Sequence, residues 1–200
     1  MPLNDFPIDP AKLSAELSER FPVLVFKLEV FRNQATLSLP GSSAHAVLKY
    51  LKEDLKLAAP AGSGDKAAAE KPLRFDVLSD LTAVDYAKYP QDLPERFAVV
   101  YQLTAFGSRP HVRLRVKASI TEETPVIDSV TDLWASADWL EREAFDMYGV
   151  QFAGHPNLIR ILLPDYYQGH PLRKDYPLKG RGERDSFPKY TDIPEETAGR

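Results

Sequence analysis

The chain has 200 residues, of which 44% are hydrophobic, a formal net charge of −4 and no cysteine. A chain of this size can bury one good core, so we expect a single domain with tails. The lack of cysteine excludes disulfides, thiolate nucleophiles and cysteine-ligated zinc or iron–sulfur centres, and the mildly acidic balance argues against nucleic acid as a partner. No run approaches the roughly 20 apolar residues of a membrane-spanning helix, and the N-terminus lacks a signal-peptide pattern, so we expect a soluble, cytoplasmic chain.

The first 55 residues predict two helices around two strands. Asp9 before Pro10 is a good helix start, and leucines at helical spacing follow it. Asn33 can turn the chain between two apolar runs, and Ser43 stands before a second amphipathic stretch. The predicted elements are a helix ending near Pro22, a strand over 23–31, a strand over 35–39 and a helix after Ser43 with Ala46, Leu48, Leu51 and Leu55 on its apolar side.

Residues 58–71 are low in bulky side chains and mix Pro, Gly, Ala and charge, which predicts a flexible surface insertion. The sequence Gly-Ser-Gly-Asp-Lys inside it superficially resembles a phosphate-binding loop. The lysine does not directly follow a glycine, no Ser or Thr follows the lysine, and no apolar strand precedes the loop. Nucleotide binding is therefore not expected there.

Three strand candidates follow, over residues 73–85, 96–106 and 111–120, and the last two are expected to form a hairpin. In the third, apolar and polar residues alternate strictly, so one face should point to the core and the other should carry a basic ladder. Either that ladder is a solvated sheet face, or it meets an acidic partner surface. The core-facing residues are Val112, Leu114 and Val116, and the ladder is His111, Arg113, Arg115 and Lys117.

A helix is predicted over residues 137–148, with Ser136 at its start and Gly149 as a left-handed stop. Its apolar positions form a stripe with additional bulk on the flanks, so the helix should be covered on more than one side. The stripe is Ala137, Leu140, Ala144 and Met147, and the flanking residues are Trp139, Phe145 and Tyr148.

Two carboxylates of this helix break local rules. Glu141 borders the apolar stripe, where a carboxylate needs an arginine or several donors. Asp146 lies in the last turn against the helix dipole, and its one close helical partner is Arg142. Such violations mark a function or a tertiary partner; the simpler alternative is that Arg142 and the basic residues after the helix neutralise both carboxylates. Glu143, two residues from Glu141, should point to another face, which disfavours a paired-carboxylate hydrolase.

The next segment contains two Gly-His-Pro turns, at His155 and His170, around an apolar, strand-like run over 158–163 that only Arg160 interrupts. Both histidines could in principle join Asp165 or Asp175 around a metal. Turn histidines more often bond the backbone, and no HxxxH or HxH pair occurs. The sequence also lacks the serine-hydrolase, zinc-protease and dinucleotide-binding fingerprints.

These motifs resemble a known family. They are Glu141-Arg142-Glu143, Asp146-Met147-Tyr148-Gly149, His155-Pro156, Arg160-Ile161-Leu162 and Gly169-His170-Pro171-Leu172-Arg173-Lys174-Asp175-Tyr176-Pro177, with Ser129 to Trp134 before them. In order and spacing they look like the C subunit, of the 30 kDa type, of proton-pumping NADH:quinone oxidoreductase, respiratory complex I. Residues before 129 fit that family only in their pattern of elements, and the insertion over 58–71 departs from it.

The resemblance implies a cofactor-free structural subunit of the peripheral arm. It would dock on the hydrogenase-like D subunit beside the iron–sulfur and quinone-reducing subunits, on the cytoplasmic side of the cell membrane. The iron–sulfur clusters, FMN and quinone would be held by partner subunits, and no residue of this chain is expected to be catalytic. The residues expected to matter for the interface or the fold are Glu141, Arg142, Glu143, Asp146, His155, Arg160, His170, Arg173, Asp175 and Tyr176.

The predicted fold is α+β, with a mixed or antiparallel sheet flanked by helices and an extended C-terminal region. Residues 1–150 would form the core domain and residues 151–200 the partner-binding region. The tail over 179–200 is either disordered or an arm anchored by Phe187, Pro188 and Tyr190. Two alternatives stay open: an equivalent subunit of a membrane-bound hydrogenase or of a complex without the NADH module, and a free-standing small-molecule enzyme that uses His155 and His170.

Overall fold

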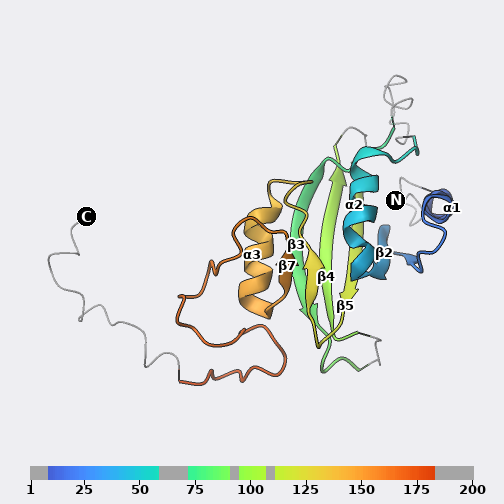
Figure 1. Cartoon of the computed structure of the whole chain (residues 1–200). Coiled ribbons are helices and arrows are strands. Elements are labelled where there is room, and N and C mark those ends of the chain that lie inside the picture. The colour runs from blue at the N-terminus through green and yellow to red at the C-terminus, as the bar shows by residue number, and fades with distance from the viewer. Residues whose placement is uncertain (1–8, 59–71, 91–94, 107–110, 183–200) are drawn as a thin grey trace.

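A computed structural model describes residues 9–58, 72–90, 95–106 and 111–182. Within them the chain forms a mixed five-stranded sheet in the order β1-β2-β5-β4-β3, a two-stranded sheet of β6 and β7, and three α-helices (Figure 1). The predicted α+β class is confirmed. In chain order the elements are α1 (Pro10–Arg20), β1 (Lys27–Phe31), β2 (Gln34–Pro40), the 3-10 turn η1 (Gly41–Ser43), α2 (Ala44–Glu53), β3 (Val77–Asp85), β4 (Phe97–Ala105), β5 (Val112–Ile120), β6 (Val126–Asp128), α3 (Ala137–Tyr148) and β7 (Gln151–Ala153).

The first helix begins as predicted. The Asp9 carboxylate accepts a hydrogen bond from the Ala11 amide at 2.9 Å, and Leu13 and Leu17 are fully buried. The strand expected over 23–31 is too long, because pairing with β2 begins only at Lys27 and Val23 is 92% exposed. Apolar composition alone does not make a strand where no neighbouring strand supplies hydrogen bonds.

The central strands pair as predicted, with β4 and β5 antiparallel in continuous register and Leu114 buried. The sheet also contains one parallel pair, β2 with β5. The strand expected from residue 73 begins only at Val77. Before it, the amides of Leu73 and Phe75 donate to the carbonyls of Leu57 and Leu51 around the end of α2.

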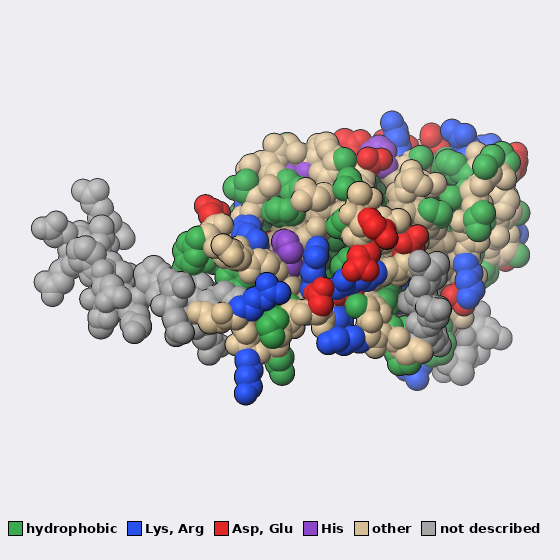
Figure 2. Space-filling view, turned by 60° about the horizontal axis from the view of Figure 1, so that its bottom comes forward, with side chains coloured by type: hydrophobic (Ala, Val, Ile, Leu, Met, Phe, Trp, Pro, Cys, Tyr) green, Lys and Arg blue, Asp and Glu red, His purple; other side chains and the backbone are tan. Residues whose placement is uncertain are grey.

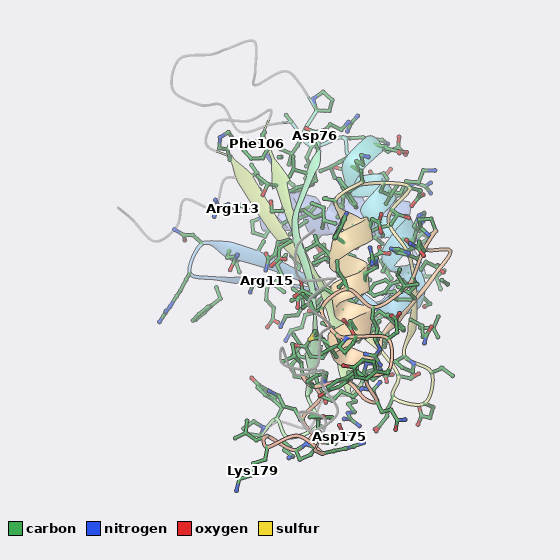
Figure 3. The ribbon with its side chains drawn as sticks, turned by 90° about the vertical axis from the view of Figure 1, so that its left-hand side faces the viewer. Asp76, Phe106, Arg113, Arg115, Asp175 and Lys179 are labelled. Carbon is green, nitrogen blue, oxygen red and sulfur yellow. The ribbon has the colours of Figure 1, made fainter. Side chains whose placement is uncertain are left out.

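The helices α2 and α3 lie on the same face of the sheet, toward its opposite edges, and α3 packs against β3 (Figures 1 and 3). As predicted, α3 is covered on more than one side, because the ring of His170 in the C-terminal segment also meets Phe145. Trp139 differs from this expectation, since it is 63% exposed. Ser136 precedes the helix without capping it; its hydroxyl donates to the Leu78 carbonyl at 3.2 Å.

After β7 the described chain contains neither helix nor strand up to residue 182, so the strand-like run over 158–163 does not form a strand. The amides of Ile161, Leu162 and Leu163 bind a side chain instead of a neighbouring strand. No helix of the described residues is both long and apolar enough to cross a membrane. The insertion over 58–71, beyond Ala58, and the tail from residue 183 lie outside the described residues.

Candidate interaction site around the last helix

The buried carboxylate of Asp146 connects α3 to the C-terminal segment. Its Oδ1 accepts from Arg160 at 2.6 Å, and its Oδ2 accepts from the amides of Ile161, Leu162 and Leu163 at 3.1, 2.8 and 2.8 Å. Burial raises the pKa of Asp146, but these amides and the Arg160 guanidinium outweigh burial and lower it below the ordinary value. A negative charge that opposes the helix dipole is thus held by four donors from a neighbouring segment.

The same segment caps the C-terminal end of α3. His170 Nδ1 donates to the carbonyl of Asp146 at 2.9 Å, the Leu172 amide donates to that of Met147 at 3.1 Å, and Arg173 Nε donates to that of Tyr148. These carbonyls lack intrahelical partners, so the segment satisfies groups that the helix leaves free. Gly149 follows with a φ of 75°, and an added Cβ there would lie 2.5 Å from Arg173.

The simpler prediction is half right: Arg160, a basic residue after the helix, pairs with Asp146, but Arg142 forms no ion pair with the acidic residues of its helix. Its Nε and Nη2 each donate at 3.1 Å to the carbonyls of Ile159 and Arg160, and its guanidinium lies over the ring of Trp139 at 5.3 Å. The two residues are four apart on the helix, but Arg160 from the following segment binds Asp146, and the carbonyls of that segment take the donors of Arg142. Arg142 therefore fastens the outer surface of α3 to the segment after it.

Glu141 and His155 meet on the inner side of the same helix. Glu141 is fully buried, and its Oε1 accepts from the Val130 amide at 2.7 Å. His155 Nδ1 accepts from the Asn157 amide at 3.0 Å, which leaves the proton on Nε2, and Nε2 donates to the Asp138 carbonyl at 3.1 Å. The backbone role predicted for both turn histidines is confirmed.

Burial raises the pKa of Glu141. The Val130 amide and the Ser129 hydroxyl lower it, but burial has the larger effect, so the pKa lies above its ordinary value. A raised folded-state pKa means that the contribution of this group to stability is complete below about pH 4.3 and is lost as the pH rises through the folded-state value. Glu141→Gln should remove this loss, so its free energy of unfolding should fall less than that of the wild type between about pH 5 and pH 8.

Urea unfolding of the purified chain across that pH range measures the effect. Glu143→Gln is the matched control, because Glu143 lies on the same helix and is exposed. Identical pH slopes for Glu141→Gln and the wild type would show that Glu141 ionises as easily in the folded chain as in the unfolded one.

A second ionic cluster joins the C-terminal segment to the sheet, and it is centred on Arg96. Arg96 Nη2 contacts both Asp85 and Asp175 at 2.9 Å, while a second nitrogen, Nη1, contacts Glu122. The Asp85 carboxylate also accepts from the Lys174 amide at 2.8 Å. The pKa of Asp175 lies below its ordinary value, mainly because its carboxylate is bonded to Arg96. Slight burial raises the pKa but does not outweigh this effect.

The sequence prediction included Asp175 but missed Arg96 and Asp85. Asp85 could have been recognised from the sequence, because it ends an apolar run at a core-facing position. A carboxylate at such a position requires a cation or several hydrogen-bond donors. Tyr176, also predicted, stacks obliquely on Tyr167, and their hydroxyls are 2.7 Å apart.

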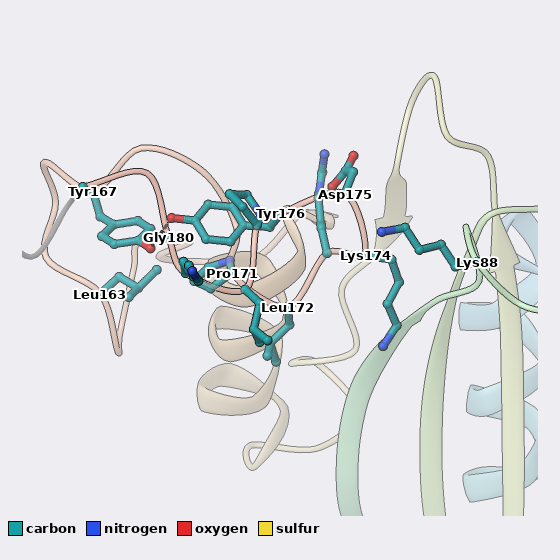
Figure 4. A pocket seen from close by; sticks show the side chains of 14 residues that line it. Lys88, Leu163, Tyr167, Pro171, Leu172, Lys174, Asp175, Tyr176 and Gly180 are labelled. Atoms are coloured by element: carbon teal, nitrogen blue, oxygen red, sulfur yellow. Dashed lines mark hydrogen bonds between the residues drawn. The ribbon is translucent and has the colours of Figure 1, made fainter.

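Where this segment crosses the end of the sheet, basic and acidic side chains gather on one face (Figure 2). A groove of about 1120 Å³ opens there (Figure 4). Lys88 reaches across it toward Lys174 and Asp175, while apolar and aromatic side chains form its other end. The groove is lined by Lys88, Leu163, Tyr167, Pro171, Leu172, Arg173, Lys174, Asp175, Tyr176, Pro177, Leu178, Lys179, Gly180 and Gly182.

Eight of the ten predicted residues thus fall into three groups. Asp146, Arg160, His170 and Arg173 meet at the end of α3; Glu141 and His155 meet on its inner side; and Asp175 and Tyr176 lie with the groove. Glu143 is exposed on the outer side of α3, and Arg142 braces that side. Among the described residues no group of three or more His, Asp or Glu side chains is placed to hold a metal.

Three comparisons place the chain among known proteins. The family described as respiratory-chain NADH dehydrogenase, 30 Kd subunit, matches residues 38–182. The chain is 44% identical to the C subunit of NADH-quinone oxidoreductase from Citrifermentans bemidjiense over 165 residues, which are 82% of this chain and 88% of that protein. It is 48% identical to the corresponding C subunit from Thermus thermophilus over 121 residues, which are 57% and 56% of the two chains.

Solved structures agree. The trypsin-resistant fragment of Nqo5 is 32% identical with a TM-score of 0.52, over 74% of this chain and 99% of the fragment. A chain of the archaeal membrane-bound sulfane sulfur reductase shares the fold, with a TM-score of 0.62 at 19% identity over 92% and 96% of the two chains. The chain therefore belongs to the family of respiratory-chain NADH dehydrogenase 30 kDa subunits, the C subunits of the multisubunit NADH-quinone oxidoreductase.

Proposed function

We propose that this chain is a cofactor-free, non-catalytic subunit of the peripheral arm, docked on the hydrogenase-like D subunit beside the iron–sulfur subunits. In this role it supports NADH-driven quinone reduction coupled to proton translocation, on the cytoplasmic side of the membrane, without touching the reacting groups. The observation that carries the proposal is a set of large apolar side chains left exposed on α3 and on the segment that follows it. We name it the α3 patch; it consists of Trp139, Ile159 and Leu162, which are 63%, 51% and 62% exposed.

The α3 patch is built on a rigid base. Arg142 lies over the ring of Trp139 and donates to the carbonyl of Ile159, so one side chain holds the Trp139 ring and the Ile159 backbone. The amide of the third, Leu162, donates to the buried Asp146 carboxylate. Large exposed apolar side chains on a backbone fixed in this way favour a protein interface, because binding does not have to order the segment that carries them.

The bonding of the polar residues around α3 supports a structural role as well. Both ring nitrogens of His155 bond backbone groups, and the buried carboxylate of Asp146 is saturated by four donors. A general base or nucleophile needs a lone pair that a substrate can reach. These groups hold the fold of α3 and its following segment in the shape that presents the α3 patch.

Trp139→Ser should lower the amount of the D subunit recovered with an affinity-tagged chain by about tenfold or more, as expected for the loss of an aromatic anchor. The measurement is mild purification of the membrane complex from cells that carry only the variant, with quantitation of each subunit and of NADH:quinone activity. Phe106→Ser is the matched control, because Phe106 is 54% exposed at the far end of the sheet (Figure 3).

Recovery of a hydrogenase in place of NADH-oxidising subunits with the wild-type chain would select the related membrane complex instead. A wild-type chain that leaves the membrane alone, with bound metal or substrate turnover, would overturn the proposal in favour of a free-standing enzyme. If Trp139→Ser and Phe106→Ser lose the D subunit equally, the loss is not specific to Trp139, and the α3 patch is not the interface.

A further inference from the structure

The face of the sheet opposite α2 and α3 carries a row of three cations from β5. Arg113, Arg115 and Lys117 occupy alternate positions of the strand, whereas Val112, Leu114 and Val116 between them are fully buried. Arg113 and Arg115 lie on the side of the sheet away from both helices (Figure 3). Residues two apart in a strand are roughly 7 Å apart, so three like charges stand in one line. We name this row, Arg113, Arg115 and Lys117, the basic row.

The strands on either side of the basic row offer it no opposite charge. On β4 the residues in register with the row are Thr104, Gln102 and Val100. On β2, Thr36 is in register with Arg115 and Ser38 with Lys117. The row thus runs between two strips of uncharged residues.

In the part of the chain that the structure describes, the acidic residues near the basic row are either paired with another cation or distant from it. Glu29 pairs with Lys27 at 2.8 Å. Asp80 on β3 is in register with Gln102 on β4, and Gln102 is in register with Arg115 on β5. Asp80 is therefore two strand spacings, or roughly 10 Å, from Arg115. Among the described residues none of the three cations forms an ion pair, and Arg115 donates only to the amide oxygen of Gln34 at 2.8 Å.

This arrangement is unfavourable for the isolated chain. Like charges on adjacent positions of one face repel one another, and a chain of net charge −4 has acidic residues that would relieve the repulsion if they were nearby. A flat strip of three cations bordered by short neutral side chains is, however, complementary to a surface with carboxylates at similar spacing.

We propose that the basic row is a second docking surface of this chain and binds an acidic protein surface of a neighbouring subunit. The inference rests on the proposed function, because it takes the chain to be held in an assembly. It adds that the chain is held from both sides of its sheet, by the α3 patch on one side and by the basic row on the other. A protein partner is favoured over nucleic acid because the chain is acidic overall and the row itself consists of three cations on one strand.

The test is charge reversal in the intact complex. Arg113→Glu combined with Arg115→Glu should lower recovery of at least one partner subunit by about tenfold at physiological salt, because like charges then face each other across the interface. Arg113→Gln with Arg115→Gln should give a smaller loss, which a salt titration of subunit recovery reveals. Wild-type recovery should itself fall toward about 1 M salt, where the Debye length is about 3 Å.

Lys12→Glu combined with Lys49→Glu is the matched control, since it makes the same change of charge at exposed positions of α1 and α2. The thermal midpoint of each purified variant checks that the fold is kept. If the wild-type complex is intact and the double variant Arg113→Glu, Arg115→Glu still recovers every subunit, the basic row is not a docking surface. The proposed function would be unaffected by that result. Loss of bound nucleic acid instead of a subunit would overturn the basic row as a protein docking surface too, whereas a wild-type chain without partner subunits would refute the proposed function itself.

Discussion

Asp146→Ala should lower the free energy of unfolding by about 3–5 kcal/mol, the range for removing one partner of a buried ion pair. The substitution leaves the Arg160 guanidinium without its carboxylate and three consecutive amides, of Ile161, Leu162 and Leu163, without an acceptor. Residues 160–163 should loosen from α3, since the Asp146 side chain is their main contact with the helix, while the contacts of His170, Leu172 and Arg173 with the helix end remain. Urea unfolding gives the energy, and hydrogen exchange of the three amides shows where the chain opens.

The pH dependence of the wild type supplies an independent check. Because the folded-state pKa of Asp146 is lowered, its contribution to stability is present above about pH 3.9 and is lost as the pH falls through the folded-state value. Asp146→Asn should lack this acid-side loss and should be less destabilised than Asp146→Ala, because an amide oxygen still accepts. Glu143→Ala, on the exposed side of the same helix, should change stability by no more than about 0.5 kcal/mol. A similarly small effect of Asp146→Ala would contradict the structure of this contact.

Arg96→Met should also lower the free energy of unfolding by about 3–5 kcal/mol, because it leaves the carboxylate of Asp85 buried without a cation. Asp85 would keep the amides of Ala87 and Lys174 as donors, which limits the effect. Burial raises the pKa of Asp85, whereas the hydrogen bonds and charge of Arg96 lower it. In the wild type the lowering outweighs the effect of burial. The variant should therefore lose part of the stability that the wild type retains above about pH 3.9.

A double-mutant cycle separates the pair from its surroundings. Asp85→Asn in the Arg96→Met background should restore part of the lost stability, since it removes the unpaired charge. Arg32→Met is the control for loss of an arginine, because Arg32 lies exposed at the tip of the β1–β2 turn. Additive effects of Asp85→Asn and Arg96→Met would mean that the 2.9 Å contact between them contributes no coupling energy.

The elements that the sequence predicted well depend on local interactions. The first helix follows from Asp9 and Pro10, α3 ends at Gly149 because a left-handed residue stops a helix, and β5 follows from a strict period of two. Asp146 and Glu141 were recognised as unusual because each violates a rule that involves only its own helix. In each of these cases the decisive atoms lie within about four residues in the chain.

The partners of those residues could not be predicted in the same way. Arg142 and Arg160 were both candidates for Asp146, and only the course of the chain after β7 brings Arg160 to it and gives Arg142 backbone carbonyls to bind instead. The run over 158–163 has the composition of a strand, yet its amides bind the Asp146 carboxylate. Composition cannot distinguish these outcomes, because both satisfy the same backbone donors.

The sequence by itself determined the α+β class, the ends of α1 and α3, the alternating faces of β5 and the family, since these depend on short-range spacing and on motifs within about forty residues. Only the tertiary structure decided that β2 and β5 are parallel neighbours, that Arg96 joins Asp85 to Asp175, and which surfaces stay uncovered. The physical reason is that ion pairs and sheet register join groups far apart in the chain. Their energies depend on burial and on distances that arise only when the whole chain has folded.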